Sequence, residues 1–125
     1  MYPRVRVFGG SSVDPIIAAT IAQKASSCER VLVILDSDHT HEHVLGELRL
    51  YAPLVTVGSY CVVFDTVIED LEGVEFTDRP WGKGDNPKTA VAEFLRSTND
   101  FVVDSSIDGK LLVSAAPGGY LKRVQ

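Results

Sequence analysis

Two runs of apolar residues that each end in an aspartate place the strongest constraint on how this chain can fold. The segments "RVLVILD" (30–36) and "YCVVFD" (60–65) are apolar almost throughout, as strands covered on both faces of a sheet are. Helical patterns lie between and around them, which indicates an α/β protein with a largely parallel sheet. Sheets of this kind bind ligands beyond the carboxyl ends of their strands, and that is where Asp36 and Asp65 fall.

Capping residues and helix breakers locate three helices. The sequence predicts helices over 14–25, from Thr40 to Pro53, and over 86–97. Asp14, Thr40 and Asn86 supply the expected N-caps, and prolines follow two of these caps directly, as the first helical position allows.

Three further segments are expected to be strands. "VRVF" (5–8) is a short β-branched run, and "FVVDSS" (101–106) and "KLLVSA" (110–115) flank the dipeptide Asp108-Gly109. Asp-Gly between two apolar runs is a strong signal for a hairpin. We therefore predict a Rossmann-like, mostly parallel sheet with helices on both faces and a C-terminal antiparallel β-hairpin.

Length and composition limit the classes of function. The 125 residues are predicted to form one domain (1–125), and the net charge of −5 argues against a nucleic-acid partner. No apolar run is long enough to span a membrane, and the first residues lack a signal peptide. Cys28 and Cys61 show no metal-binding spacing and are expected to be reduced thiols of a cytoplasmic protein, with a single disulfide as the alternative.

The acids at the two strand ends predict a metal site. Neighbouring strands lie about 4.8 Å apart, so Asp36 and Asp65 would be close enough to share a Mg²⁺ ion, which prefers oxygen ligands. Thr66 would add a hydroxyl, and His39 is placed to act as a general base.

Two other interpretations of the same residues stay open at this point. Asp38 or Thr40 would serve only as a helix cap, with His41 and His43 facing solvent. Alternatively the three histidines, His39 among them, would bind zinc, although their spacing places them poorly on one helical face.

Four segments together resemble one known family. "VLVILDSDHTHEHVLGELRLYAPLV", "GSYCVVFDTVIED", "RPWGKGDNPKTAV" and "KLLVSAAPGGYLKR" are similar to the cephalosporin hydroxylase / rhamnosyl O-methyltransferase family. The resemblance implies the class I S-adenosylmethionine methyltransferase fold and a site layout like that of the Mg²⁺-dependent catechol and caffeoyl-CoA O-methyltransferases.

Carried over residue by residue, the resemblance implies metal ligands and a base. Asp36 and Asp65 fall on the first and second acidic ligands of the family. Thr66 falls where relatives use Asn or Asp, and His39 falls where the catechol-type enzymes place a catalytic lysine.

The resemblance also implies a cofactor loop and a lid. "GGSSVD" (9–14) matches the loop that borders the adenine of S-adenosylmethionine, with Gly10, Ser12 and Val13 as cofactor contacts. Trp81, within a segment that matches a substrate-covering loop, would be a lid residue. The alternative is that its indole is buried and only fixes the loop.

Two cofactor elements of the family have no counterpart in this sequence: the glycine-rich loop after the first strand and the acid after the second. The chain resembles the C-terminal half of the fold and lacks its first two strands. The full sheet order is 3-2-1-4-5-7-6, so "VRVF" would lose its neighbour. We expect it to move beside "VLVIL" or to pair across a homodimer, unless an N-terminal segment is missing.

The expected function follows from the resemblance. It implies Mg²⁺-dependent transfer of a methyl group from S-adenosylmethionine to a small-molecule acceptor, a hydroxyl of a sugar, glycolipid or natural product. The alternative is a non-catalytic remnant that serves as a dimerising or small-molecule-binding module.

Overall fold

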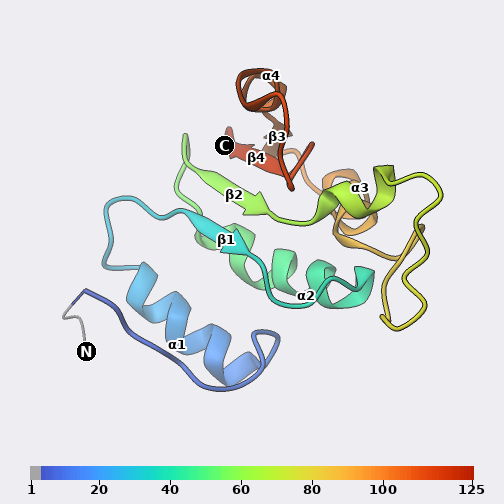
Figure 1. Cartoon of the computed structure of the whole chain (residues 1–125). Helices are drawn as coiled ribbons and strands as arrows, with labels where there is room; N and C mark the ends of the chain where they lie inside the picture. The colour runs from blue at the N-terminus through green and yellow to red at the C-terminus, as the bar shows by residue number, and fades with distance from the viewer. Residues whose placement is uncertain (1–3) are drawn as a thin grey trace.

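The computed structural model describes residues 4–125, which form a four-stranded sheet flanked by helices (Figure 1). The elements, in chain order, are α1 (Pro15–Ala25), β1 (Val33–Leu35), α2 (His41–Tyr51), the 3₁₀ helix η1 (Ala52–Leu54), β2 (Tyr60–Val63), the 3₁₀ helix η2 (Thr66–Asp70), α3 (Pro87–Arg96), β3 (Phe101–Val103), α4 (Ser105–Leu111) and β4 (Tyr120–Arg123).

The strand order confirms the predicted fold class. The order across the sheet is β1-β2-β4-β3. Strands β1 and β2 are parallel, with Leu35 opposite Val63, and β4 runs antiparallel to both of its neighbours. Strands β1, β2 and β3 therefore run in one direction, and the C-terminal β3–β4 pair is antiparallel, as predicted.

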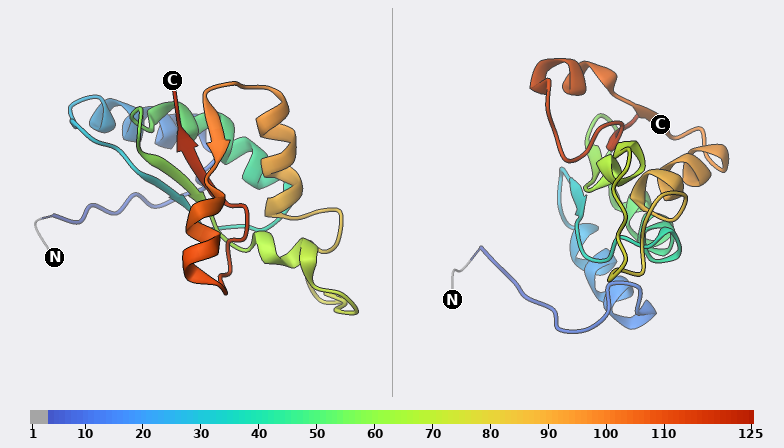
Figure 2. Two further views of the ribbon diagram at one scale, coloured as in Figure 1. Left: turned by 90° about the horizontal axis from the view of Figure 1, so that it is seen from above. Right: turned by 45° about the vertical axis from the view of Figure 1, so that its right-hand side comes forward.

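The core lies between the sheet and one layer of helices. Helices α2 and α3 cover one face of the sheet, and α4 lies on the opposite side (Figure 2). Buried residues of that core come from α2, α3 and the strands, and they include Leu48, Phe94, Cys61, Val63 and Leu121.

The three predicted N-caps are confirmed. The Asp14 carboxylate accepts a hydrogen bond from the amide of Ile16 at 2.8 Å, and the Thr40 hydroxyl oxygen accepts one from the amide of His43. Asn86 forms a reciprocal capping box with Thr89 at the start of α3. These caps fix where α1, α2 and α3 begin.

Strand β1 is covered on one face only, which contradicts the prediction that it is covered on both. Leu35 is 6% exposed, but Ile34 and Leu32 are 58% and 53% exposed. The prediction was correct for β2, where Cys61, Val62 and Val63 are all buried. The difference arises because β1 is an edge strand and no helix of residues 4–125 covers its outer face.

Two of the predicted strands are absent. Residues 5–8 form an exposed, irregular segment that does not pair with β1. Residues 110–115 are not a strand, and Asp108-Gly109 lies inside α4 rather than in a hairpin turn. Asp104 caps this helix by accepting a hydrogen bond from the amide of Ser106, so a local helix forms where the dipeptide alone favours a turn.

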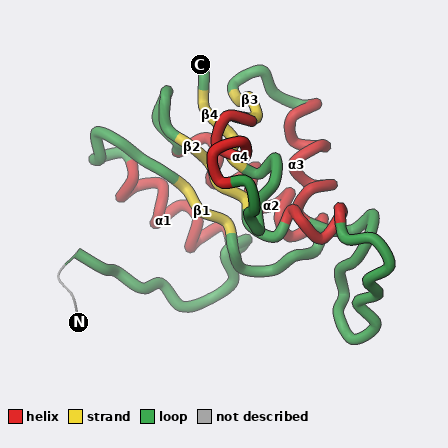
Figure 3. The backbone as a smooth tube through the Cα atoms, turned by 45° about the horizontal axis from the view of Figure 1, so that its top comes forward, coloured by secondary structure: helices red, strands yellow, loops and turns green. Residues whose placement is uncertain are grey.

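The final strand begins later than predicted. It is β4, which follows Gly118-Gly119, and a loop after α4 leads into it (Figure 3). A second long loop connects η2 to α3 and projects beside the carboxyl ends of β1 and β2.

Candidate active site

The two parallel strands bring Asp36 and Asp65 together. Asp36 follows β1 directly, and Asp65 comes two residues after the last residue of β2. Asp36, His39 and Asp65 each offer a ligand atom, and these atoms lie within 4.8 Å of one another. No other group of three or more His, Cys, Asp or Glu side chains in residues 4–125 meets this criterion. The cluster that the sequence predicted is therefore assembled by the fold.

His39 lies against the second aspartate of the cluster. Its Nε2 atom is 3.1 Å from Oδ2 of Asp65, and the two side chains are 20% and 32% exposed. Asp65 has a left-handed backbone, with φ of 56°, a conformation that aspartate tolerates better than most residues. The side chains of His39 and Asp65 are thus accessible to solvent, and the backbone turns sharply at Asp65.

Trp81 lies beside His39. The indole and imidazole rings meet edge to face with centroids 4.7 Å apart, and the Arg79 guanidinium lies 5.5 Å from the indole centroid. The indole is half-buried rather than enclosed. Its position next to the cluster is what the predicted lid requires, and closure over a substrate stays a prediction.

The base of the Trp81 loop is held by Glu69 of η2. Its carboxylate accepts hydrogen bonds from the Gly84 amide, at 2.8 Å, and from the Asn86 side chain. These bonds lower the pKa of Glu69, the Gly84 amide first and the Asn86 side chain second. Since Asn86 also caps α3, the loop is tied at one end to a helix of the core.

The donor set of the cluster fits Mg²⁺. Two carboxylates supply hard oxygen ligands, and Asp36 is exposed to solvent, so substrate and water can complete the coordination. The nitrogen of His39 suits Mg²⁺ less well and suits proton transfer better. Thr66 is fully buried, and its hydroxyl donates a hydrogen bond to the carbonyl of Pro117 at 2.8 Å. Its role as a third ligand stays a prediction.

Thr40 has the capping role that the sequence left open, and Asp38 bonds to this cap residue. Asp38 accepts hydrogen bonds from both the amide and the hydroxyl of Thr40, at 2.8 and 2.7 Å. These bonds lower the pKa of Asp38. Asp38 is therefore engaged in the turn before α2 and does not belong to the metal cluster.

The other two histidines are half-buried and bonded to neighbouring side chains, so they are not the solvent-facing residues that the sequence predicted. His41 contacts Thr89 and Glu93 of α3, at 2.7 and 2.9 Å from its two ring nitrogens. His43 contacts Ser12 at 3.0 Å. Because His41 and His43 are held by different partners, away from His39, no zinc site made of the three histidines forms among the described residues.

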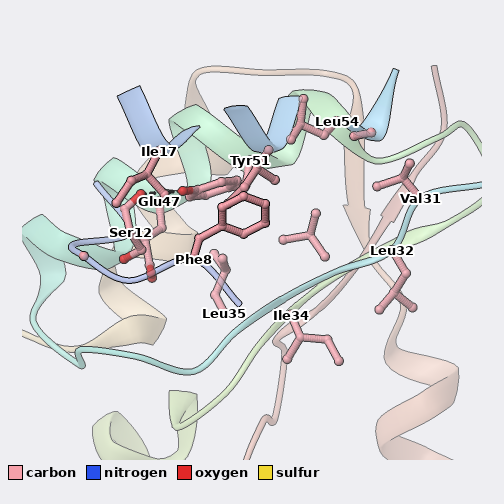
Figure 4. A pocket seen from close by; sticks show the side chains of 14 residues that line it. Phe8, Ser12, Ile17, Val31, Leu32, Ile34, Leu35, Glu47, Tyr51 and Leu54 are labelled. Carbon is pink, nitrogen blue, oxygen red and sulfur yellow. Dashed lines mark hydrogen bonds between the residues drawn. The ribbon is translucent and has the colours of Figure 1, made fainter. Parts of the chain in front are cut away.

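The predicted cofactor contacts separate into two places. Gly10 and Ser12 line a cavity of about 380 Å³ between α1, β1 and α2 (Figure 4). Gly10 has φ of 137°, and a Cβ atom there would overlap Ile17, so the tight entry into α1 requires glycine. Val13 instead packs against Gly46 of α2 and lines a different surface hollow.

Sequence reasoning missed Glu47, a buried carboxylate at the Ser12 end of the same cavity. It is 2% exposed and accepts a hydrogen bond from the Ser37 hydroxyl at 2.7 Å. A signal was present, because Glu47 falls within the helical apolar stripe formed by Val44, Leu48 and Tyr51. A charged residue in such a stripe indicates either a structural polar network or a binding group.

Both cysteines are free, which excludes the alternative of a disulfide between them. Cys28 is exposed and Cys61 is buried in the core. Burial, followed by the negative charge of Glu47, raises the pKa of Cys61 to about 12.

Comparison with known proteins agrees with the resemblance. The relatives it finds include proteins named rhamnosyl O-methyltransferase from Mycobacterium tuberculosis H37Rv and Mycobacterium bovis BCG, each 34% identical over 123 residues. The protein of that name from Mycobacterium leprae is 32% identical over 123 residues. These matches cover 97% of this chain but 48% to 51% of the relatives, so the chain spans about half the length of the curated relatives it matches.

No solved structure matches the chain. None of the helices in residues 4–125 has the length and apolar character needed to cross a membrane. The family model described as rhamnosyl O-methyltransferase/CmcI matches residues 1–124, and the chain therefore belongs to this family.

Proposed function

We propose that this chain carries the metal and proton-transfer part of a Mg²⁺-dependent, S-adenosylmethionine-dependent O-methyltransferase. The acceptor would be a hydroxyl of a sugar, glycolipid or natural product. The observation that carries the proposal is the cluster of Asp36, His39 and Asp65 at the carboxyl ends of adjacent parallel strands. Family membership and the names of the relatives support methyl transfer to a sugar.

The two aspartates would hold the metal. Bound Mg²⁺ supplies a positive charge that lowers the pKa of an acceptor hydroxyl. Asp36 is the more exposed of the two ligands, whereas Asp65 has a left-handed backbone that fixes the turn presenting it. The third protein ligand would be Thr66, or water would take its place.

His39 would remove the proton of the acceptor hydroxyl. Its Nε2 atom faces the cluster, and imidazole transfers protons efficiently near neutral pH. Trp81 packs edge-on against this ring, which fixes the orientation of the base and covers one side of the site. S-adenosylmethionine supplies the methyl group, and Gly10 and Ser12 would border it.

The first test is isothermal titration of S-adenosylmethionine into the chain with and without Mg²⁺. We expect binding that strengthens when Mg²⁺ is present. Absence of binding under both conditions would contradict the proposal for this chain on its own.

Metal binding can be tested separately through Trp81, the single tryptophan of the sequence. Mg²⁺ that binds Asp65 competes with His39 for this carboxylate, so the fluorescence of the neighbouring indole should change on titration. Asp36→Asn should weaken the apparent Mg²⁺ affinity at least about tenfold, because it removes one of two charged ligands. Asp78→Asn, a change at an exposed aspartate of the Trp81 loop, is the matched control and should leave the affinity unchanged.

A specific observation supports the second candidate, a non-catalytic dimerising or small-molecule-binding module. Leu32 and Ile34 expose apolar surface at β1, whose outer edge pairs with no strand of residues 4–125, and such edges pair readily with other chains. The native mass in solution distinguishes the candidates: a stable dimer without Mg²⁺-dependent cofactor binding would favour the module.

A further inference from the structure

The short turn that follows Trp81 is closed by its own backbone. Gly82 and Asp85 form an antiparallel bridge, in which the amide of each donates to the carbonyl of the other at 2.9 and 3.1 Å. The side chain of Asn86, which is fully buried, donates a further hydrogen bond to the carbonyl of Gly82 at 2.9 Å. These bonds give residues 82–86, called the clasp below, a defined shape.

Three separate elements hold the clasp. Glu69 of η2 accepts a hydrogen bond from the amide of Gly84, and Asn86 is the N-cap of α3. Oδ1 of Asp85 accepts a hydrogen bond from the amide of His41, at the start of α2, at 2.7 Å. Figure 1 shows the loop that contains the clasp, in yellow, beside the end of α2 at which this helix begins. The clasp could therefore open as a unit only by breaking contacts with η2, α2 and α3 together.

The bond between Asp85 and His41 has a clear physical basis. His41 is the first residue of α2, and the amides of the first helical turn have no acceptor within their own helix. The carboxylate of Asp85, 44 positions away in the sequence, supplies this acceptor, and a negative charge near the start of a helix is favourable. The clasp thus helps to fix where the backbone enters α2.

The clasp and the residue before it contact the segment 39–41 at two points. The indole of Trp81 meets the imidazole of His39 edge to face, with centroids 4.7 Å apart, and Asp85 bonds to the amide of His41. Between these two contacts, the imidazole of His39 is directed at Asp65, with Nε2 3.1 Å from Oδ2. A displacement of the clasp would disturb both contacts, and with them the direction of the imidazole.

We infer that Asp85 and Trp81 are positioning residues for His39, and that the clasp forms a fixed wall of the site rather than a moving lid. Asp85 fixes the start of α2 and Trp81 holds the imidazole, so the imidazole faces Asp65 before any ligand binds. The inference deepens the proposed function and rests on it, because His39 is the proposed base, and a base is most effective when its orientation is set in advance.

The first test uses hydrogen exchange of the native, ligand-free chain. The amide of Gly84 is bonded to Glu69, whereas the amide of Gly73, an exposed glycine of the same loop, has no acceptor among the described residues. If the clasp is a fixed wall, Gly84 should be protected from exchange at least about tenfold more than Gly73, as expected for a hydrogen bond to a charged group. A lid that is open without ligand would leave both amides equally unprotected.

The second test follows the ring protons of His39 by NMR, because the neighbouring indole shifts their resonances. Asp85→Ala should remove most of this shift, and Asp85→Asn should retain it, since the asparagine side chain keeps an acceptor oxygen for the amide of His41. Asp14→Ala is the matched control, because it removes a carboxylate that accepts from an amide in the first turn of α1. It should lower the urea midpoint of unfolding and leave the His39 shift unchanged.

Three outcomes would overturn the inference: equal exchange of Gly84 and Gly73, an unchanged His39 shift in Asp85→Ala, and the same loss of this shift in Asp14→Ala. If Asp85→Ala does not fold, Asp85→Glu replaces it, and the longer side chain should displace the carboxylate and change the shift. Both tests are made without Mg²⁺ or S-adenosylmethionine. A fixed clasp in a chain that binds no cofactor would contradict the proposed function alone, and a mobile clasp in a chain that binds cofactor would contradict the inference alone.

Discussion

Gly119 gives the sharpest test of the packing beneath the candidate site. It is buried immediately before β4, and a Cβ atom there would lie closer than 3.0 Å to the carbonyl oxygen of Val63. Its own carbonyl accepts a hydrogen bond from the Val63 amide at 2.8 Å. The two backbones are therefore in direct contact two residues before Asp65, and nothing flexible can move aside.

We expect Gly119→Ala to destabilise the fold by about 2–3 kcal/mol. Overpacking typically costs about 1–3 kcal/mol, and this clash is with backbone rather than with a mobile side chain, so the upper part of that range applies. Urea unfolding at equilibrium measures the change, with the midpoint shifted and the slope unchanged. Mg²⁺ affinity should fall as well, because the end of β2 must move.

Gly109→Ala is the matched control for this prediction. Gly109 lies in α4, and a Cβ atom there would meet nothing within 4 Å. Alanine favours a helix over glycine by about 0.5–1 kcal/mol, so the control should stabilise the chain. If Gly119→Ala changed the stability by less than about 0.5 kcal/mol, or if both substitutions had the same sign, the packing argument would be wrong.

Two further predictions follow from pKa values. Cys28 should react with a thiol reagent in the native state at pH 8, and Cys61 only after unfolding, because burial raises the pKa of Cys61 to about 12. The unfolded thiol ionises near its ordinary pKa of 9.0. Cys61 therefore stabilises the fold below pH 9 and loses that contribution as pH rises toward 12. A free energy of unfolding that stays constant over this pH range would refute the prediction. The pKa of Glu69 is lowered from 4.5 by the Gly84 amide and the Asn86 side chain. Its contribution to stability is therefore present above pH 4.5 and lost below it, and the Gly84 amide resonance should titrate below pH 4.5 in the native chain and not in Glu69→Gln.

The sequence was informative about the site because the relevant signals are local. An apolar run that ends in an acid identifies both a strand and its carboxyl end, so Asp36 and Asp65 could be paired before the fold was known. The N-caps Asp14, Thr40 and Asn86 could also be predicted, because capping depends on three or four neighbouring residues.

The errors occurred where distant contacts or competing local signals decide the structure. Asp108-Gly109 favours a turn, but the Asp104 cap makes the surrounding segment helical. The outer face of β1 is exposed because no described element lies over it. This exposure cannot be predicted from the apolar sequence of the strand alone. His43 contacts Ser12, which lies in a distant segment of the chain, and a one-dimensional pattern does not bring these two residues together.

The metal cluster and the cavity should be separable by mutation. Asp36 and Asp65 are positioned by β1 and β2, whereas Glu47 is positioned by α2, and Ser37, which follows Asp36, donates a hydrogen bond to Glu47. Glutamine at position 47 preserves the acceptor for Ser37, so Glu47→Gln should leave the Mg²⁺ titration of Trp81 fluorescence unchanged. If Glu47→Gln altered the apparent Mg²⁺ affinity by more than about threefold, the two regions would form one coupled site, and the separation of these carboxylates would fail.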